Sequence, residues 1–92
     1  MIESIRSKAL KRYWARGDRS LLPERHLKRI KHYLDRLDAS VRPTDMKLPG
    51  FDFHGLKGDR RGTYAVTVAG NWPVTFRWSG ENATDVDYED YH

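Results

Sequence analysis

The chain has 92 residues, of which 38% are apolar and 33% charged, and it contains no cysteine. A chain of this length holds one domain, since domains usually contain about 100–150 residues. The absence of cysteine excludes disulfides, zinc–thiolate sites and thiol nucleophiles. No apolar run approaches the roughly 20 residues that span a membrane, and the N-terminal residues lack the apolar stretch of a secretion signal. We therefore expect one soluble, cytoplasmic domain over residues 1–92 that has no contact with a membrane.

The positive charge is concentrated in the N-terminal half of the chain. Residues 1–50 contain 13 Lys and Arg against 6 Asp and Glu, a net charge of +7. Residues 51–92 contain 4 against 7, a net charge of −3. A basic half favours a polyanionic partner, because binding to phosphates releases condensed counterions. A solvated helical surface explains the same charge, so composition alone leaves both interpretations open.

Two helices are predicted in the basic half. Ser7 is a suitable N-cap for a helix over residues 8–16, and Gly17 is a suitable end. The apolar residues of this first helix share one face, namely Leu10, Tyr13 and Trp14. A second helix begins near Pro23, which is tolerated in a first turn. Its apolar residues follow a 3-4-3 spacing and form one stripe, namely Leu27, Ile30, Leu34 and Leu37.

After an irregular connection around residues 43–50, the apolar period changes from that of a helix to two. This alternation predicts three antiparallel strands joined by short turns, over residues 63–68, 72–78 and 84–88. Residues 1–5 alternate weakly, which predicts a further short strand at the edge of the same sheet. The fold class is therefore α+β, with two N-terminal helices packed on one face of a twisted, mainly antiparallel sheet.

Alternation also assigns the strand residues to the two faces of the sheet. The face toward the helices takes the larger apolar residues, namely Tyr64, Val66, Val68, Trp72, Val74, Phe76 and Trp78. The opposite face takes smaller or polar residues, namely Thr63, Ala65, Thr67, Pro73, Thr75 and Arg77. Because no helix is left to cover this second face, we expect it to meet water or a ligand and to form the floor of a polar cleft.

Two segments hold most of the chemically useful side chains, at residues 51–62 and 87–92. Histidines with a tyrosine, an aspartate and several cations can cleave RNA without a metal ion. One group removes the proton of the ribose 2′-hydroxyl, another protonates the leaving 5′-oxygen, and cations stabilise the phosphorane. A histidine titrates near neutrality and suits either role, so the residues alone assign neither role to a particular group.

Each of these features also has a structural explanation. A terminal histidine such as His92 is more often frayed than catalytic, and the Gly-rich segment at residues 57–62 is typical of a solvated turn. The acidic residues and histidine at the chain end suggest a metal site, but no ligand spacing supports it. His26 and His32 fall on the basic second helix, where we expect both at the surface.

Three separated motifs resemble those of one protein family. They are Leu56-Lys57-Gly58-Asp59-Arg60 with Gly62, then Gly70-Asn71-Trp72 with Thr75-Phe76, and finally Val86-Asp87-Tyr88-Glu89-Asp90-Tyr91-His92. In order and spacing they resemble the HigB toxins, also called plasmid maintenance killer proteins, of the RelE/ParE superfamily. The resemblance extends over essentially the whole chain.

This resemblance implies a RelE-like fold and the toxin of a type II toxin–antitoxin system. The implied activity is that of a ribosome-dependent messenger-RNA endonuclease, which occupies the 30S A site and needs no cofactor. The implied partner is a HigA-type helix-turn-helix antitoxin, with operator DNA bound only through that antitoxin. The basic helices would then lie against ribosomal RNA.

Site residues follow from the resemblance by matching position. The implied catalytic group is His54, Asp90, Tyr91 and His92. The implied phosphate contacts are Lys57 and Arg60, with Arg61 and Arg77 as further RNA-binding candidates. Since His54 precedes the three predicted strands and His92 follows them, both can reach the same end of the second sheet face.

Pro73 departs from the family pattern, which has arginine after Gly-Asn-Trp. An arginine there would lie on the second sheet face and could hold the scissile phosphate by paired hydrogen bonds. Proline has no charge and no backbone N–H, which is unfavourable in a strand except at a bulge or an edge. Two interpretations stay open: Pro73 weakens the toxin, or Arg77 or Arg61 replaces the missing arginine.

Two other functions are compatible with the same fold. One is that of a ParE-like toxin that acts on gyrase and cleaves no RNA. The other is an inactive toxin that serves only as an antitoxin-binding co-repressor. The combination of Asp90, His92 and His54 favours the ribonuclease, because a gyrase poison has no need of convergent acid and base groups.

Overall fold

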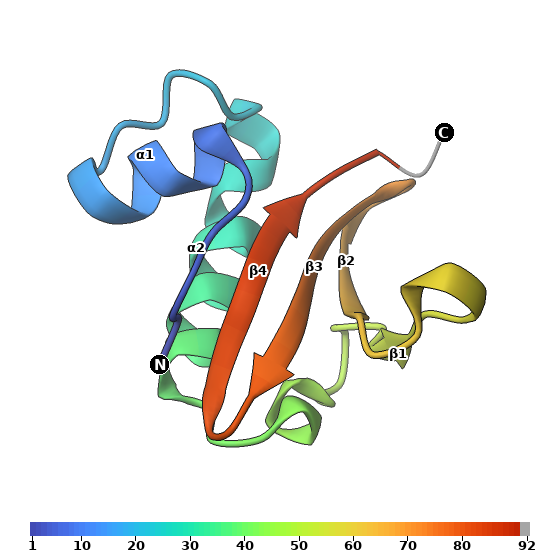
Figure 1. Cartoon of the computed structure of the whole chain (residues 1–92). Helices are drawn as coiled ribbons and strands as arrows, with labels where there is room; N and C mark the ends of the chain where they lie inside the picture. The colour runs from blue at the N-terminus through green and yellow to red at the C-terminus, as the bar shows by residue number, and fades with distance from the viewer. Residues whose placement is uncertain (91–92) are drawn as a thin grey trace.

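The computed structural model describes residues 1–90 and has two helices on one side of a four-stranded antiparallel sheet (Figure 1). The helices are α1 (Lys8–Arg16) and α2 (Glu24–Ala39), followed by the 3-10 turn η1 (Pro43–Met46). The strands are β1 (His54–Gly55), β2 (Tyr64–Ala69), β3 (Trp72–Ser79) and β4 (Asn82–Tyr88), with the 3-10 turn η2 (Gly58–Arg60) between β1 and β2. The predicted α+β class is confirmed.

The ends of the helices follow from local chemistry. Ser7 caps α1 by accepting a hydrogen bond from the Leu10 amide at 3.2 Å. Gly17 ends α1 with a left-handed φ of 71° and donates its amide to the Tyr13 carbonyl. Pro23 is the N-cap of α2, one residue before the first turn in which we expected it. None of the helices within residues 1–90 is both long enough and apolar enough to cross a membrane.

The core lies between α2 and the sheet. The whole predicted stripe of α2 is buried, and its partners are the large residues on the predicted inner face of β2 and β3. The buried core residues from these elements are Leu27, Ile30, Tyr33, Leu34, Leu37, Val66, Val68, Val74 and Phe76. Periodicity therefore predicted this side of the sheet correctly.

The predicted strand over residues 1–5 is reduced to two isolated bridges. Ile2 pairs with Ala83 and Ile5 with Val86, both in parallel, so the segment runs beside β4 (Figure 1). The fourth strand is β1 instead, at the opposite edge of the sheet, in a segment where we predicted no strand. Two residues of pairing are too few to produce a visible alternation, so the sequence pattern missed β1.

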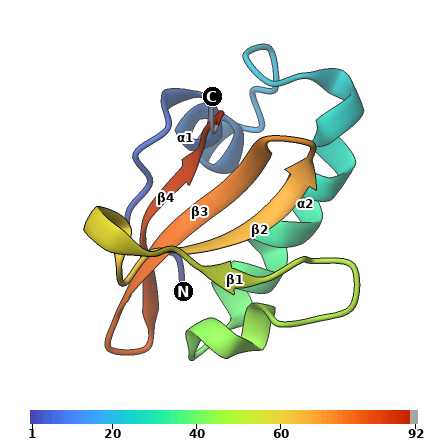
Figure 2. The same cartoon turned by 90° about the vertical axis from the view of Figure 1, so that its right-hand side faces the viewer.

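The second face of the sheet is more closed than predicted. We expected Thr63, Ala65, Pro73 and Thr75 to meet water or ligand, but each is buried. Figure 2 shows why: the loop that carries β1 and η2 crosses in front of the strands, on the side away from α2. Because these four residues are buried, they do not form the floor of the open polar cleft that we predicted.

Candidate active site

The strand register aligns one row of residues across the second face of the sheet. His54 of β1 pairs with Ala65 of β2, Ala65 with Thr75 of β3, and Thr75 with Asp87 of β4. Since neighbouring strands lie about 4.8 Å apart, His54 and Thr75 are about 10 Å apart across the sheet, with the small Ala65 between them. This row places the predicted histidine on the same face as the end of the chain.

His54 is half-buried, and its ring is held by its own loop. The Nδ1 atom lies 2.9 Å from the Asp52 carbonyl oxygen. A carbonyl oxygen can only accept a hydrogen bond, so Nδ1 carries the hydrogen. In the neutral ring the lone pair is therefore on Nε2, which is the arrangement required of a proton acceptor.

The loop before His54 is anchored to β2. Thr67 donates its hydroxyl to the Asp52 carboxylate at 2.8 Å, and the Thr67 amide donates to the Phe51 carbonyl at 2.9 Å. Asp52 itself has a left-handed backbone, with φ of 52°. Such a conformation is uncommon outside glycine and needs support from neighbouring contacts, which Thr67 provides here.

Glu89 is the centre of a second cluster on this face. Both terminal nitrogens of Arg60 donate to its carboxylate, one of them over 2.9 Å, and Thr75 donates its hydroxyl over 2.7 Å. The pKa of Glu89 is held below its ordinary value, mainly by the hydrogen bond from Arg60 against the opposing effect of burial. Arg60 was predicted to contact phosphate; here its planar fork holds a carboxylate of matching shape.

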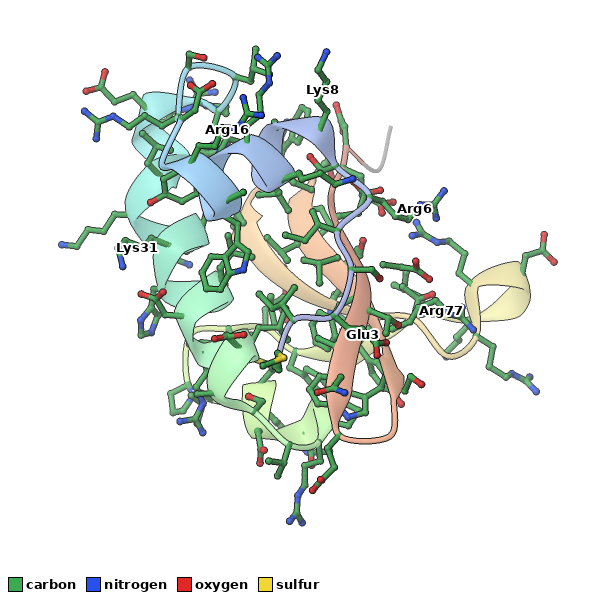
Figure 3. The ribbon with its side chains drawn as sticks, turned by 60° about the vertical axis from the view of Figure 1, so that its left-hand side comes forward. Glu3, Arg6, Lys8, Arg16, Lys31 and Arg77 are labelled. Atoms are coloured by element: carbon green, nitrogen blue, oxygen red, sulfur yellow. The ribbon has the colours of Figure 1, made fainter. Side chains whose placement is uncertain are left out.

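Arg6 is a site residue that sequence reasoning missed. Its positive charge contributes to the lowered pKa of Glu89. Its backbone amide donates to the Val86 carbonyl at 2.8 Å, which positions Arg6 beside the end of β4. In Figure 3 its side chain extends toward the η2 side of the molecule. The weak alternation of residues 1–5 was the available signal, since it predicted that this segment joins the sheet.

The remaining predicted RNA-binding residues lie around η2 and the adjacent part of β3. Lys57 and Arg61 flank η2 and are exposed. Arg77 lies on the side of the sheet away from α2 (Figure 3) and donates to the Thr63 hydroxyl at 3.1 Å. Its guanidinium also fits against Gly62, where an added Cβ would lie 3.2 Å from one of its nitrogens. All the lysines and arginines of the C-terminal half thus gather near one part of this face.

Glu89, near the end of the chain, and the loop before His54 lie at the same position along the strand direction, in one row across the sheet. The Glu89 amide donates to the Pro73 carbonyl at 3.3 Å, Pro73 pairs with Thr67, and Thr67 holds Asp52. Glu89 and Asp52 are therefore three strand spacings apart, which is about 14 Å across the sheet. Asp90 is exposed, and Tyr91 and His92 lie outside the described residues. The convergence of His54 with these three residues therefore stays a prediction.

Pro73 occupies a position that tolerates proline. It lies opposite an irregularity in β2, where the pairing shifts between Thr67 and Ala69. A bulge is one of the few places where a strand can lack a ladder N–H. The ring has no polar group to offer to a ligand, and it is also fully buried.

His26 is buried, which corrects our expectation of a surface residue; His32 is exposed as predicted. His26 Nδ1 forms a hydrogen bond with the Tyr88 hydroxyl across the core. Burial, followed by the charge of Arg25, lowers the pKa of His26. The helical stripe missed this residue because His26 lies beside Leu27 at the edge of the apolar face, where Tyr88 satisfies its ring nitrogen.

Two other features of the described residues bear on ligands. Within residues 1–90, no group of three or more His, Asp or Glu side chains is placed to hold a metal ion. A pocket of about 470 Å³ lies between α2 and residues 49–51 and has none of the predicted site residues in its lining. We assign the candidate active site to the sheet face, because the proton-transfer and phosphate-binding residue types gather there.

Together these observations define a class: a single α+β domain with a basic helical layer and a sheet face bordered by a histidine, carboxylates and arginines. Residues 3–92 match the family described as the RelE-like toxin of the type II toxin–antitoxin system HigB. The chain is also 35% identical to Endoribonuclease HigB from Proteus vulgaris over 92 residues, which is the full length of both. This chain belongs to the HigB-like toxin family, and a toxin of a type II system has an antitoxin partner.

Proposed function

We propose that this toxin is an endoribonuclease that cuts messenger RNA in the ribosomal A site and thereby stops translation. The observation that carries the proposal is that the His54 loop and Glu89 lie at the same position along the strands of one sheet face, where Arg60 holds the Glu89 carboxylate. The similarity to a full-length relative named Endoribonuclease HigB supports the same reaction class.

The reaction requires one proton acceptor and one proton donor around the scissile phosphate. A base removes the proton of the 2′-hydroxyl, the 2′-oxygen attacks phosphorus, and the bond to the 5′-oxygen breaks as an acid protonates it. His54 presents Nε2 and suits one role. Asp90, Tyr91 and His92 supply the other, so that a 2′,3′-cyclic phosphate and a free 5′-hydroxyl are formed.

Cations stabilise the charge on phosphorus in the transition state. Lys57, Arg61 and Arg77 are near enough to this face to share that role. Arg60 already holds the Glu89 carboxylate, so an RNA phosphate reaches Arg60 only by competing with Glu89. Glu89 therefore keeps the guanidinium aligned before RNA arrives and reduces its affinity for phosphate.

The finer partner assignments belong to the same proposal. The antitoxin is of the HigA type, with a helix-turn-helix fold, and operator DNA is bound only through it. The ribosome and its messenger RNA are met in the cytoplasm. The net charge of +7 on residues 1–50 favours association with ribosomal RNA.

The test is cleavage of a defined message on programmed ribosomes, with the RNA ends mapped. We expect cuts by the wild-type chain, and losses of at least about tenfold for His54→Ala and for His92→Gln. Glu81→Gln, in the exposed β3–β4 turn, is the matched control and should cut normally. Wild-type rates in both histidine variants would reject the assignment. Inhibition of gyrase without RNA cleavage would identify the ParE-like alternative.

A further inference from the structure

One feature that the proposed reaction leaves unused is the pocket of about 470 Å³ beside α2. One wall is formed by α2 and the other by the loop at residues 49–51. The lining residues are Arg25, Lys28, Arg29, His32, Tyr33, Pro49, Gly50 and Phe51. The pocket therefore combines cations and aromatic rings and contains no carboxylate.

The three cations of the pocket lie on one face of α2. Arg25, Lys28 and Arg29 are spaced three and four residues apart, so their side chains project in the same direction. All three are exposed. The salt bridges formed among residues 1–90 involve none of them. Concentrated positive charge of this kind, without an acidic neighbour in the pocket, attracts a polyanion.

The aromatic part of the pocket is firmly held. Tyr33 donates its hydroxyl to the Thr67 carbonyl at 2.6 Å, and its ring centroid lies 4.6 Å from that of Phe51. The exposed His32 ring meets Phe51 edge-on, with centroids 5.4 Å apart. The buried rings of Tyr33 and Phe51 thus support the exposed His32 ring. An exposed ring beside cations suits a nucleotide, whose base stacks while its phosphate is neutralised.

The pocket also adjoins the candidate active site. Phe51 lines the pocket, and His54 follows it by three residues, which span at most about 10 Å of chain. Thr67 links the two sites, since it bonds to Phe51 and to Asp52. This short separation allows one RNA strand to contact both His54 and the pocket.

We propose that this pocket binds a nucleotide of single-stranded RNA, with its phosphate on Arg25, Lys28 and Arg29 and its base against His32. The assignment rests on the proposed function, since it gives the RNA a second anchoring point beyond the scissile phosphate. Single-stranded RNA can come from the message itself or from an unpaired segment of ribosomal RNA. Both sources present the same chemistry, so the experiment must separate them.

The experiment compares two full-length double variants with equal changes in charge. Arg25→Ala/Lys28→Ala removes pocket cations. Lys8→Ala/Lys31→Ala removes one exposed lysine from α1 and one from α2; both point away from the fold in Figure 3. Affinity is measured for a labelled uridine oligonucleotide and for vacant 30S subunits, and thermal melting establishes that each variant is folded.

We expect the pocket variant to bind either the oligonucleotide or the 30S subunits at least tenfold more weakly than the control variant does. The slope of log affinity against log salt should also fall by about 1.4, since each lost contact to a single strand removes about 0.7. Loss with the oligonucleotide alone identifies the message as the source, and loss with vacant 30S subunits identifies ribosomal RNA. His32→Ala should weaken binding without changing the slope, because it removes stacking.

Equal behaviour of the two double variants in both arms would overturn the proposal. So would loss of antitoxin binding alone, which would make the pocket a protein-binding site. The outcome is separable from the proposed function. If the wild-type chain binds through the pocket but cuts no message, the ribonuclease assignment fails and the pocket assignment stands. If the wild-type chain cuts the message and the pocket variant keeps its KM and its affinity, the pocket assignment fails and the ribonuclease assignment stands.

Discussion

The hydrogen bond between His26 and Tyr88 connects the first turn of α2 with the last residue of β4, directly before Glu89 and Asp90. Tyr88→Phe removes only the hydroxyl and keeps the ring stacked on Trp72, whose centroid lies 5.0 Å away. His26 is 4% exposed, so water cannot replace the lost partner. A buried polar atom left without a partner costs about 1–3 kcal/mol. In a domain of this size, this lowers Tm by roughly 4–8 °C per kcal/mol.

A double-mutant cycle isolates this interaction. In a His26→Leu background no ring nitrogen is left unpaired, so Tyr88→Phe should cost at least about 1 kcal/mol less than it does in the wild type. Urea unfolding at neutral pH measures each free energy. Tyr13→Phe is the control, since the Tyr13 hydroxyl forms no hydrogen bond among the residues described. An equal cost of Tyr88→Phe in both backgrounds would refute the reasoning.

Because His26 is buried beside Tyr88, the stability of the folded protein should also depend on pH, and the direction of this dependence can be derived. Burial lowers the pKa of His26 in the folded protein, so the unfolded chain binds more protons between that value and the ordinary 6.5. The contribution of neutral His26 to stability is complete above pH 6.5 and falls as the pH drops below it. The stability of the wild-type chain should therefore decrease relative to His26→Leu on acidification from that point.

Two further substitutions test the sheet face. The pKa of Glu89 in the folded protein is lowered chiefly by Arg60, so the ion pair stabilises the fold above the ordinary pKa of 4.5 and stops doing so as the pH falls through the folded pKa. Glu89→Gln should therefore reduce the loss of stability on acidification, measured as the free energy of urea unfolding at each pH. A profile equal to that of the wild type would show that the pair contributes nothing. Because both side chains are partly exposed, we expect the pair to contribute no more than about 1 kcal/mol. Pro73→Arg supplies the guanidinium that the family pattern has and should raise ribosomal cleavage and growth arrest on expression; toxicity equal to that of the present chain would instead indicate that Arg77 or Arg61 fills the role.

The sequence by itself determined the elements that depend on near neighbours. Helix α1 ends where Ser7 and Gly17 place it, and the stripe of α2 is buried as its spacing predicts. Strands β2, β3 and β4 were found within one or two residues of their predicted ends. The family was also evident from three motifs, because the order and spacing of residues are properties of the chain alone.

Tertiary structure decided which side chains meet. The bond between His26 and Tyr88 spans 62 residues, and that between Arg60 and Glu89 spans 29. No periodicity can reveal such pairs, because periodicity reports only the direction of a side chain from its own helix or strand. Packing of the η2 loop over the sheet likewise closed a face that alternation had left open. The exposed cations of α2 became a pocket only when residues 49–51 folded against them.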